Sequence, residues 1–171
     1  MRFLYSRHKG DPVKNGEGLP YELKVFQPKL GRLMLPGERW SVKAAANRLI
    51  FQIATRGKAR VFYVEQEGQL VHTSYVVPRC GKFPFLQESD FEIGPCYTYP
   101  QFRGKGVYPQ VLCGICRELG DSHTTFYMIV SDTNLPSIKG VEKAGFQTCG
   151  SVEVSRLFKR YRRIELPNQV R

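Results

Sequence analysis

One segment constrains the fold more than any other, because it predicts a strand, a glycine-rich loop and a helix in succession. The apolar, β-prone run 91–98 is followed by the loop 101–106, which reads Gln-Phe-Arg-Gly-Lys-Gly. Over residues 108–119, apolar residues then recur at helical spacing. Gly104 and Gly106 lack a Cβ, so a ligand can approach the backbone closely, and the first N–H groups of a helix have no intrahelical partner. The segment therefore predicts a site for a phosphate-bearing ligand.

This loop differs from the two best-known phosphate loops. No Gly-Lys-Ser/Thr follows four residues after a first Gly, and Pro109 stands where a dinucleotide fingerprint has its third Gly. Pro109 instead suits the first turn of a helix, where its missing N–H costs nothing. Arg103 and Lys105 add positive charge. On the loop alone, a glycine turn that binds no ligand is the alternative interpretation.

The loop matches the pattern Gln/Arg-x-x-Gly-x-Gly/Ala and resembles the acetyl-CoA loop of the GNAT-type N-acetyltransferases. Phe-Glu-Ile at 91–93 and Cys-Tyr-Thr at 96–98 fall where that family has its fourth strand. Residues 134–146, which end in Glu-Lys-Ala-Gly-Phe, look like its closing segment. The resemblance is strongest over 60–150. It implies an α/β fold with a mixed, mostly antiparallel sheet flanked by helices and with a strand–glycine loop–helix acetyl-CoA site.

The resemblance also implies which residues bind acetyl-CoA. Backbone groups at the end of the fourth strand should face the thioester and the pantetheine arm, and the loop should take the pyrophosphate. Asn134 or Ser137 can cap the later helix. The expected cofactor-binding residues are Cys96, Tyr97, Thr98, Arg103, Gly104, Lys105, Gly106, Val107, Tyr108, Asn134 and Ser137.

Two residues are candidates for the base that acetyl transfer to an amine needs, because free amines are mostly protonated at neutral pH. Glu92 lies on the expected fourth strand, where a family carboxylate often serves as base; its alternative is an exposed strand residue. His72 lies on the neighbouring expected strand and titrates near neutral pH; its alternative is a structural role. Strand alternation places His72, Ser74 and Val76 on one face.

One position departs from the family pattern. Many members have a Tyr four residues before the Gly-Phe pair, as acid for the departing thiolate, but this chain has Val141 there. Tyr127, Tyr108 or a water must donate the proton, unless the thiolate leaves unaided. Cys96 is an alternative nucleophile for a covalent intermediate, but family members generally transfer acetyl directly.

The acceptor rests on a further resemblance. Segments 72–77, 82–85 and 93–96 look like a branch found in bacterial polysaccharide biosynthesis. This implies an amino sugar, free or nucleotide-linked, as the acceptor. The alternatives are a peptide or protein amine, or a CoA-binding or nucleic-acid-binding protein without transfer activity.

Length and composition fit one compact domain over residues 1–171, with residues 1–20 expected to be partly irregular. The hydrophobic content of 42% is that of a globular chain, and no apolar run approaches the roughly 18 residues that span a bilayer. The first ten residues hold no secretory apolar core, so the cytoplasm, where acetyl-CoA is found, is the default location. A homodimer is one assembly left open.

Cysteine and charge usage suggest no metal and no specific nucleic acid. Five cysteines are an odd number, which argues for free thiols, and Cys113 and Cys116 fall in the expected helix without a second ligand pair. The net charge of +11 attracts anions, and the densest basic run is 156–163. We interpret that run as a charged strand face, with a polyanion contact as the alternative.

The other expected elements complete an alternating α and β order. A helix is expected over 39–55, and its apolar positions include Trp40, Ala44, Leu49, Phe51 and Ile53. The expected strands are 21–26, 60–66, 69–77, 124–130, 147–153 and 157–164, with a hairpin turn at Glu67-Gly68 and a loop over 78–87.

Overall fold

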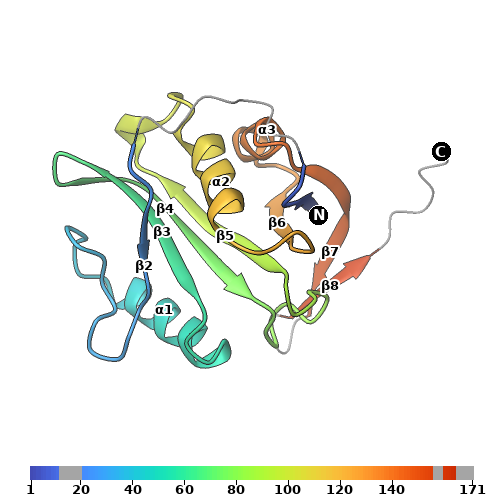
Figure 1. Cartoon of the computed structure of the whole chain (residues 1–171), viewed down its shortest axis with the longest axis horizontal. Coiled ribbons are helices and arrows are strands. Elements are labelled where there is room, and N and C mark those ends of the chain that lie inside the picture. The colour runs from blue at the N-terminus through green and yellow to red at the C-terminus, as the bar shows by residue number, and fades with distance from the viewer. Residues whose placement is uncertain (12–20, 156–159, 165–171) are drawn as a thin grey trace.

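The computed structural model describes residues 1–11, 21–155 and 160–164, which form a single twisted sheet with helices on both faces (Figure 1). In this part of the chain, eight strands lie in the order β2-β3-β4-β5-β6-β1-β7-β8, and all pairs are antiparallel except β5–β6. The elements are β1 Arg2–His8, β2 Lys24–Phe26, α1 Val42–Ala54, β3 Arg60–Gln66, β4 Gln69–Pro78, β5 Phe91–Thr98, the 3-10 helix η1 Pro100–Phe102, α2 Val107–Glu118, β6 Thr125–Ser131, α3 Leu135–Lys143, β7 Gln147–Val154 and β8 Tyr161–Ile164.

The helices divide between the two faces of the sheet. On one face, α2 buries Val111, Leu112 and Ile115 in the main hydrophobic cluster, and α3 contributes Val141 to the same cluster. On the other face, α1 buries Phe51 in a second cluster that includes Val77 of β4. Figure 1 shows α2 and α3 together on one side and α1 apart from them. Any site between α2 and α3 therefore opens away from α1.

Most of the expected elements are confirmed. The strand, loop and helix of residues 91–119 are β5, the glycine loop and α2, and Glu67 and Gly68 both take the positive φ of a tight hairpin turn. Asn134 caps α3 by accepting a hydrogen bond from the Ser137 N–H. All five cysteines are free thiols, as their odd number indicates.

The expectation of an irregular N-terminus is wrong for residues 2–8. They form β1, which lies inside the sheet between β6 and β7. The sequence pattern does not predict this strand, because it contains polar residues such as Arg7. The Arg7 guanidinium is buried and donates to the carbonyl of Ala144 at 2.7 Å and to that of Asp11 at 3.2 Å. Residues 12–20, which we expected to be turn-like, lie outside the described residues.

Three boundaries also differ from expectation, and one helix has an unusual orientation. The strand over 21–26 is only β2, and α1 begins after its cap Ser41 rather than at residue 39. Of the strand expected over 157–164, β8 accounts for Tyr161–Ile164, and 156–159 lie outside the described residues. Trp40 and Ile53 are exposed rather than packed in the core. The reason for this orientation is Arg48, which takes the inward face of α1.

The position of β1 inside the sheet makes it a stability determinant. Leu4 is fully buried, so Leu4→Ala should lower the free energy of unfolding by about 2–5 kcal/mol, the cost of a cavity at a buried leucine. Val25, on the edge strand β2, is about half exposed and serves as the matched control. Val25→Ala should cost well under half as much in urea unfolding. Equal effects at the two positions would contradict an internal β1.

Candidate functional site

The site is built on two parallel strands that are held together at one end and separate at the other. Strands β5 and β6 pair only through Phe91 with Phe126 and Glu92 with Tyr127. Asp90 joins the paired ends, because its carboxylate accepts hydrogen bonds from the N–H of Thr125 at 3.0 Å and from that of Gln87 at 2.9 Å. Beyond Glu92 the two strands run on without pairing. One edge of β5 is thus left open toward β6.

A β-bulge in β5 accompanies this separation. The register with β4 passes from Val76 opposite Ile93 to Ser74 opposite Cys96, so Gly94 and Pro95 together face one residue of β4. Pro95 has no N–H to give to a ladder. The bulge reverses the alternation of side chains along β5. Ile93 and Cys96, on either side of the bulge, therefore point to the same face of the sheet although they are three residues apart.

The glycine loop joins β5 to α2 at the mouth of this opening. Gly104 and Gly106 have φ of 76° and 74°, which a residue with a Cβ adopts only with strain. Gly106 is the N-cap of α2 and offers no capping side chain. Among the described residues, no acceptor takes the N–H groups of residues 104–106. Together with the first turn of α2, they present a row of donors to an anion.

A groove of about 790 Å³ lies between the loop, β5, α2 and α3. Its volume is in the range that holds an extended small molecule. Its walls are largely apolar, and its charged side chains come from the loop and from α3. It is lined by His72, Cys96, Tyr97, Thr98, Phe102, Arg103, Gly104, Gly106, Val107, Tyr108, Pro109, Asn134, Pro136, Ser137, Lys139, Gly140 and Lys143.

The groove gathers nearly all of the residues expected to bind a cofactor. Of that set only Lys105 is absent from the lining; its ammonium lies 5.5 Å from the centre of the Phe102 ring. Arg103 does line the groove, but its Nε donates to the Thr98 carbonyl at 2.9 Å and its guanidinium lies over the Tyr97 ring. Arg103 thus holds the loop against β5, and it also adds positive charge to the groove.

Sequence reasoning missed two cations of this groove. Lys139 and Lys143 lie four residues apart on α3, which places them on one helix face. The four-residue spacing indicates in the sequence that the two lysines share a helix face, but only the fold shows that this face lines the groove. They add positive charge on the side opposite the glycine loop.

His72 lies at the base of the groove in a chain of hydrogen bonds. Its Nδ1 is 2.7 Å from Thr98 Oγ1, and its Nε2 is 2.7 Å from Ser74 Oγ, which donates to Cys96 Sγ at 3.1 Å. Since the Ser74 hydroxyl donates to the thiol, it accepts from Nε2–H, and Nδ1 accepts from Thr98. Burial lowers the pKa of His72 to about 4. The imidazole is therefore neutral at physiological pH and fixed by two partners.

Cys96 is poorly suited to nucleophilic attack. The residue is only partly buried, but its thiol is enclosed, and burial raises the pKa of this thiol to about 12. Only the thiolate is a strong nucleophile. The geometry disfavours a covalent intermediate on Cys96.

Tyr108 fills the space between β4, β5 and α3. Its ring stacks on that of His72 at 5.7 Å between centroids, and its hydroxyl is 3.4 Å from Ser137 Oγ. A Cβ on Gly140 would come within 2.5 Å of the Tyr108 ring, so Gly140 is needed for this close packing. Burial raises the pKa of Tyr108 far above its ordinary value, which keeps its hydroxyl protonated.

Glu92 lies on the other side of the sheet from His72. The two strands are adjacent, as expected, but Glu92 pairs with Val77 and Tyr127, which belong to the cluster on the α1 side. The alternative in which Glu92 is an exposed strand residue is wrong, because Glu92 is buried. Its Oε2 has no hydrogen-bond partner among the described residues. Burial raises the pKa of Glu92 to about 8, and the charge of Lys82 offsets part of that rise.

Although it faces the other side, Glu92 is electrostatically coupled to the groove. Its charge contributes to the raised pKa values of Cys96 and Tyr108. Tyr127, the other tyrosine considered as an acid, packs edge-on against Phe85 on the Glu92 side. The opening between β5 and β6 thus has Tyr108 on one side and Glu92 with Tyr127 on the other.

Two further properties bear on function. Within residues 1–11, 21–155 and 160–164, no three His, Cys, Asp or Glu side chains gather so as to hold a metal ion. No helix of this same part of the chain has the length and apolarity to cross a membrane.

Comparisons with known proteins support the fold. No protein-family model matches the sequence, and no curated protein matches it significantly. Among solved structures, an acetyltransferase of the GNAT family from Colwellia psychrerythraea matches with a TM-score of 0.59 at 15% identity, over 86% of this chain and 52% of that one. A Drosophila protein matches with a TM-score of 0.54 at 15% identity, over 86% and 47% of the two chains.

A conserved protein of unknown function from Staphylococcus epidermidis also matches, with a TM-score of 0.53 at 10% identity, over 86% of this chain and 57% of that one. The chain thus spans about half the length of the solved structures that it resembles. At such identities the likeness shows the fold alone. The chain has the mixed α/β fold of the GNAT acetyltransferases, as its motifs predict.

Buried Glu92 should give stability a pH dependence of definite sign. Its pKa is about 8 in the folded chain against an ordinary value of 4.5, so the unfolded chain ionises first as the pH rises. The free energy of unfolding should therefore fall between about pH 4.5 and pH 8. Glu92→Gln removes the ionisation and should flatten this part of the profile in calorimetric melting.

The exposed residue Glu88 provides the control. Glu88→Gln should leave the slope of stability against pH as in the wild type. A Glu92→Gln profile as steep as the wild type would show that Glu92 does not titrate as its burial requires.

Proposed function

We propose that this protein is an acetyl-CoA-dependent N-acetyltransferase that transfers acetyl directly to a primary amine. The observation that carries the proposal is the row of donors on the loop 104–106, which lines the same groove as Cys96–Thr98 on the unpaired edge of β5. An anion site and an open strand edge along one groove suit a long ligand that has phosphates at one end.

The residues present fit acetyl-CoA. When bound, acetyl-CoA supplies the acetyl thioester and the phosphate charges. The loop N–H groups and the α2 N-terminus would hold the pyrophosphate, and Lys139 and Lys143 would attract the phosphates. The open edge of β5 over 96–98 would pair with the amides of the pantetheine arm, as one strand edge pairs with another. Asn134 and Ser137 line the same wall.

The arrangement suggests distinct roles for the groups near the opening. We assign Glu92, whose pKa is raised and which is the last residue of β5 to pair with β6, as the base that would take a proton from the amine. His72 is neutral and committed to Thr98 and Ser74, so we assign it to positioning of the β5 edge rather than to proton transfer. Backbone N–H groups of β5 would stabilise the oxyanion.

The proton for the departing thiolate is best assigned to Tyr108. Val141 is fully buried in the core and has no proton to give. Tyr108 lines the groove, whereas Tyr127 does not. Gly140 provides the room for the Tyr108 ring on α3.

For the acceptor, we propose an amino sugar, free or nucleotide-linked, in a cytoplasmic reaction of polysaccharide biosynthesis. The support is the local sequence resemblance and the net charge of +11, which suits an anionic acceptor. The alternatives are a peptide amine, or a protein that binds CoA or nucleic acid without transfer. Acetyl-CoA consumption across amino sugars, nucleotide-linked amino sugars and peptides separates them.

The glycine loop gives the first test. Gly104→Val and Gly106→Val should each weaken acetyl-CoA binding about tenfold or more in titration calorimetry, because the new side chain stands against the phosphates and removes charge-assisted hydrogen bonds. Gly81→Val is the matched control, since Gly81 lies in an open loop without positive φ. It should bind like the wild type. Unchanged affinity in both loop variants would remove the proposal.

The second test concerns the base. Glu92→Gln keeps the side-chain size and should lower turnover by roughly 10²–10⁴-fold, the usual range for a general base, with acetyl-CoA affinity nearly unchanged. His72→Gln should change the KM for acetyl-CoA more than turnover, because His72 holds the β5 edge. Steady-state kinetics with saturating acceptor measure both. A large turnover loss at His72 with normal turnover at Glu92 would transfer the role to His72.

A further inference from the structure

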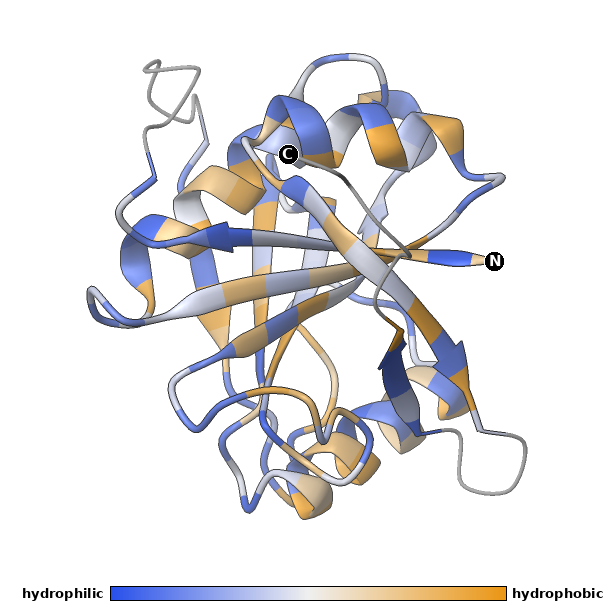
Figure 2. Ribbon diagram, turned by 90° about the vertical axis from the view of Figure 1, so that its right-hand side faces the viewer, coloured by the Kyte–Doolittle hydropathy of each residue, from blue (hydrophilic) through white to orange (hydrophobic). Residues whose placement is uncertain are grey.

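The exposed face of α1 is apolar, which is unusual for a helix on the surface of a water-soluble fold. Val42 is 72% exposed, Ile50 is 61% exposed and Ile53 is 71% exposed, and the spacing of these residues places them on one side of the helix. Trp40, just before the helix, is 72% exposed. These four residues form what we call the α1 apolar face. Figure 2 shows hydrophobic colour on the helix at the bottom of the view, where Figure 1 places α1.

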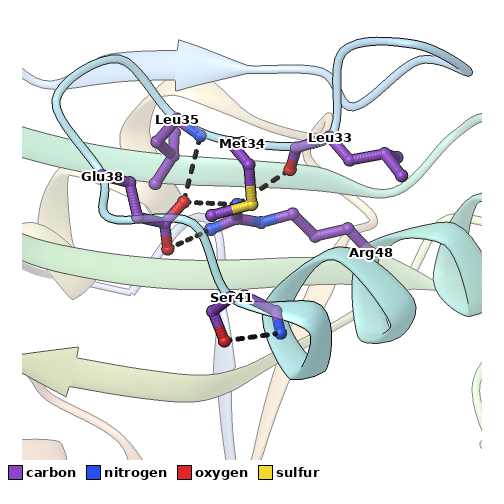
Figure 3. A network of polar contacts seen from close by, with 7 residues as sticks. Leu33, Met34, Leu35, Glu38, Ser41 and Arg48 are labelled. Carbon is purple, nitrogen blue, oxygen red and sulfur yellow. Dashed lines mark hydrogen bonds and ion pairs between the residues drawn. The ribbon is translucent and has the colours of Figure 1, made fainter.

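The inward side of the same helix is fixed by a charged residue. Arg48 is 2% exposed, its Nη1 donates to the Leu33 carbonyl at 2.8 Å, and its Nη2 donates to Glu38 Oε1 at 3.0 Å (Figure 3). Glu38 also accepts from the Leu35 N–H at 3.0 Å, and Ser41 caps the helix. This network sets the rotation of α1. The apolar residues point outward because the buried ion pair and Phe51 take the inner side.

The charged residues of the stretch that contains α1 are all cations. Residues 39–60 contain no Asp or Glu. Only the cation of Arg48 is withdrawn into the protein; Lys43 lies on α1 and the others flank its ends. The six cations of this stretch are Arg39, Lys43, Arg48, Arg56, Lys58 and Arg60.

We propose that the α1 apolar face docks on an anionic lipid bilayer surface. A helix of this kind lies in the plane of the interface, with its aliphatic side chains among the acyl chains and its cations among the headgroups. Trp40 has the ring type that favours the headgroup level. The charge argues against a second copy as occupant, because a two-fold contact through this face would bring its exposed cations against the same set.

This docking leaves the groove and the glycine loop accessible. The groove lies between α2 and α3, on the sheet face opposite α1. A bilayer under α1 therefore does not cover the glycine loop. The proposal is independent of the proposed acetyl transfer.

Vesicle flotation tests the proposal with the full chain. The protein should float with phosphatidylcholine vesicles that contain phosphatidylglycerol and much less with pure phosphatidylcholine, and added salt should weaken the binding. Trp40→Ser and Ile53→Ser should each lower the vesicle partition coefficient about tenfold, as expected for losing one buried apolar side chain. Lys43→Glu should lower it on anionic vesicles.

Two matched controls lie away from α1. Leu135 is 61% exposed at the start of α3, so Leu135→Ser removes a comparable exposed side chain. Arg162→Glu makes the same change of charge on β8 as Lys43→Glu makes on α1. Both controls should partition like the wild type. Circular dichroism spectra and melting temperatures equal to those of the wild type would show that the fold is intact in all variants.

Three outcomes would overturn the proposal. The first is a wild type that does not bind anionic vesicles. The second is binding by Trp40→Ser and Ile53→Ser equal to that of the wild type. The third is a concentration-dependent dimer in light scattering that Ile53→Ser abolishes, which would make the face a contact between copies of this chain.

Discussion

The carboxylate of Asp90 is the interaction on which the arrangement of the site depends. It joins the start of β5 to the start of β6 through the Thr125 N–H, and the two strands pair for only two residues beyond it. Past that point the bulge at Gly94 and Pro95 bends β5 and the strands separate. An edge that is open inside a sheet is costly unless something pairs with it. The opening thus leaves backbone groups of β5 unpaired beyond Glu92, where a ligand could pair with them.

The electrostatics of the groove follow from its depth. Burial keeps His72, Cys96 and Tyr108 uncharged near neutral pH, since each pKa is shifted toward the neutral form. Near neutral pH the charges of the site are therefore the cations at its mouth, because Glu92 on the far side, with a pKa of about 8, is mostly protonated as well. The groove thus has cations at one end and the neutral side chains of His72, Cys96 and Tyr108 farther in. This arrangement suits a ligand with anionic phosphates at one end and a thioester at the other.

Local signals in the sequence were enough for the parts of the fold that depend on few residues. The glycine loop is predictable because the positive φ of Gly104 and Gly106 depends only on the missing Cβ of each glycine. The face of Glu92 was not, because it depends on a bulge whose register is set by β4. Strand β1 was missed because buried Arg7 is satisfied by carbonyls that no local pattern reveals.

The same contrast applies to the helices. The spacing of apolar residues located α2 and its buried face, because the main cluster covers that face. On α1 the spacing of apolar residues does not give the buried side, since the ion pair of Arg48 with Glu38 takes that side and leaves Trp40 and Ile53 exposed. Lys139 and Lys143 joined the site only once α3 was placed beside the loop. Tertiary contacts decided each of these cases.

The central claim is that the loop, the groove and the strand opening form one continuous acetyl-CoA site. A crystal structure of the protein with bound coenzyme A tests it most directly. The account predicts the pyrophosphate on the N–H groups of residues 104–108 and the pantetheine arm along Cys96–Thr98, with its thiol at the opening between β5 and β6. Coenzyme A bound elsewhere, or a groove that stays empty at saturating coenzyme A, would contradict it.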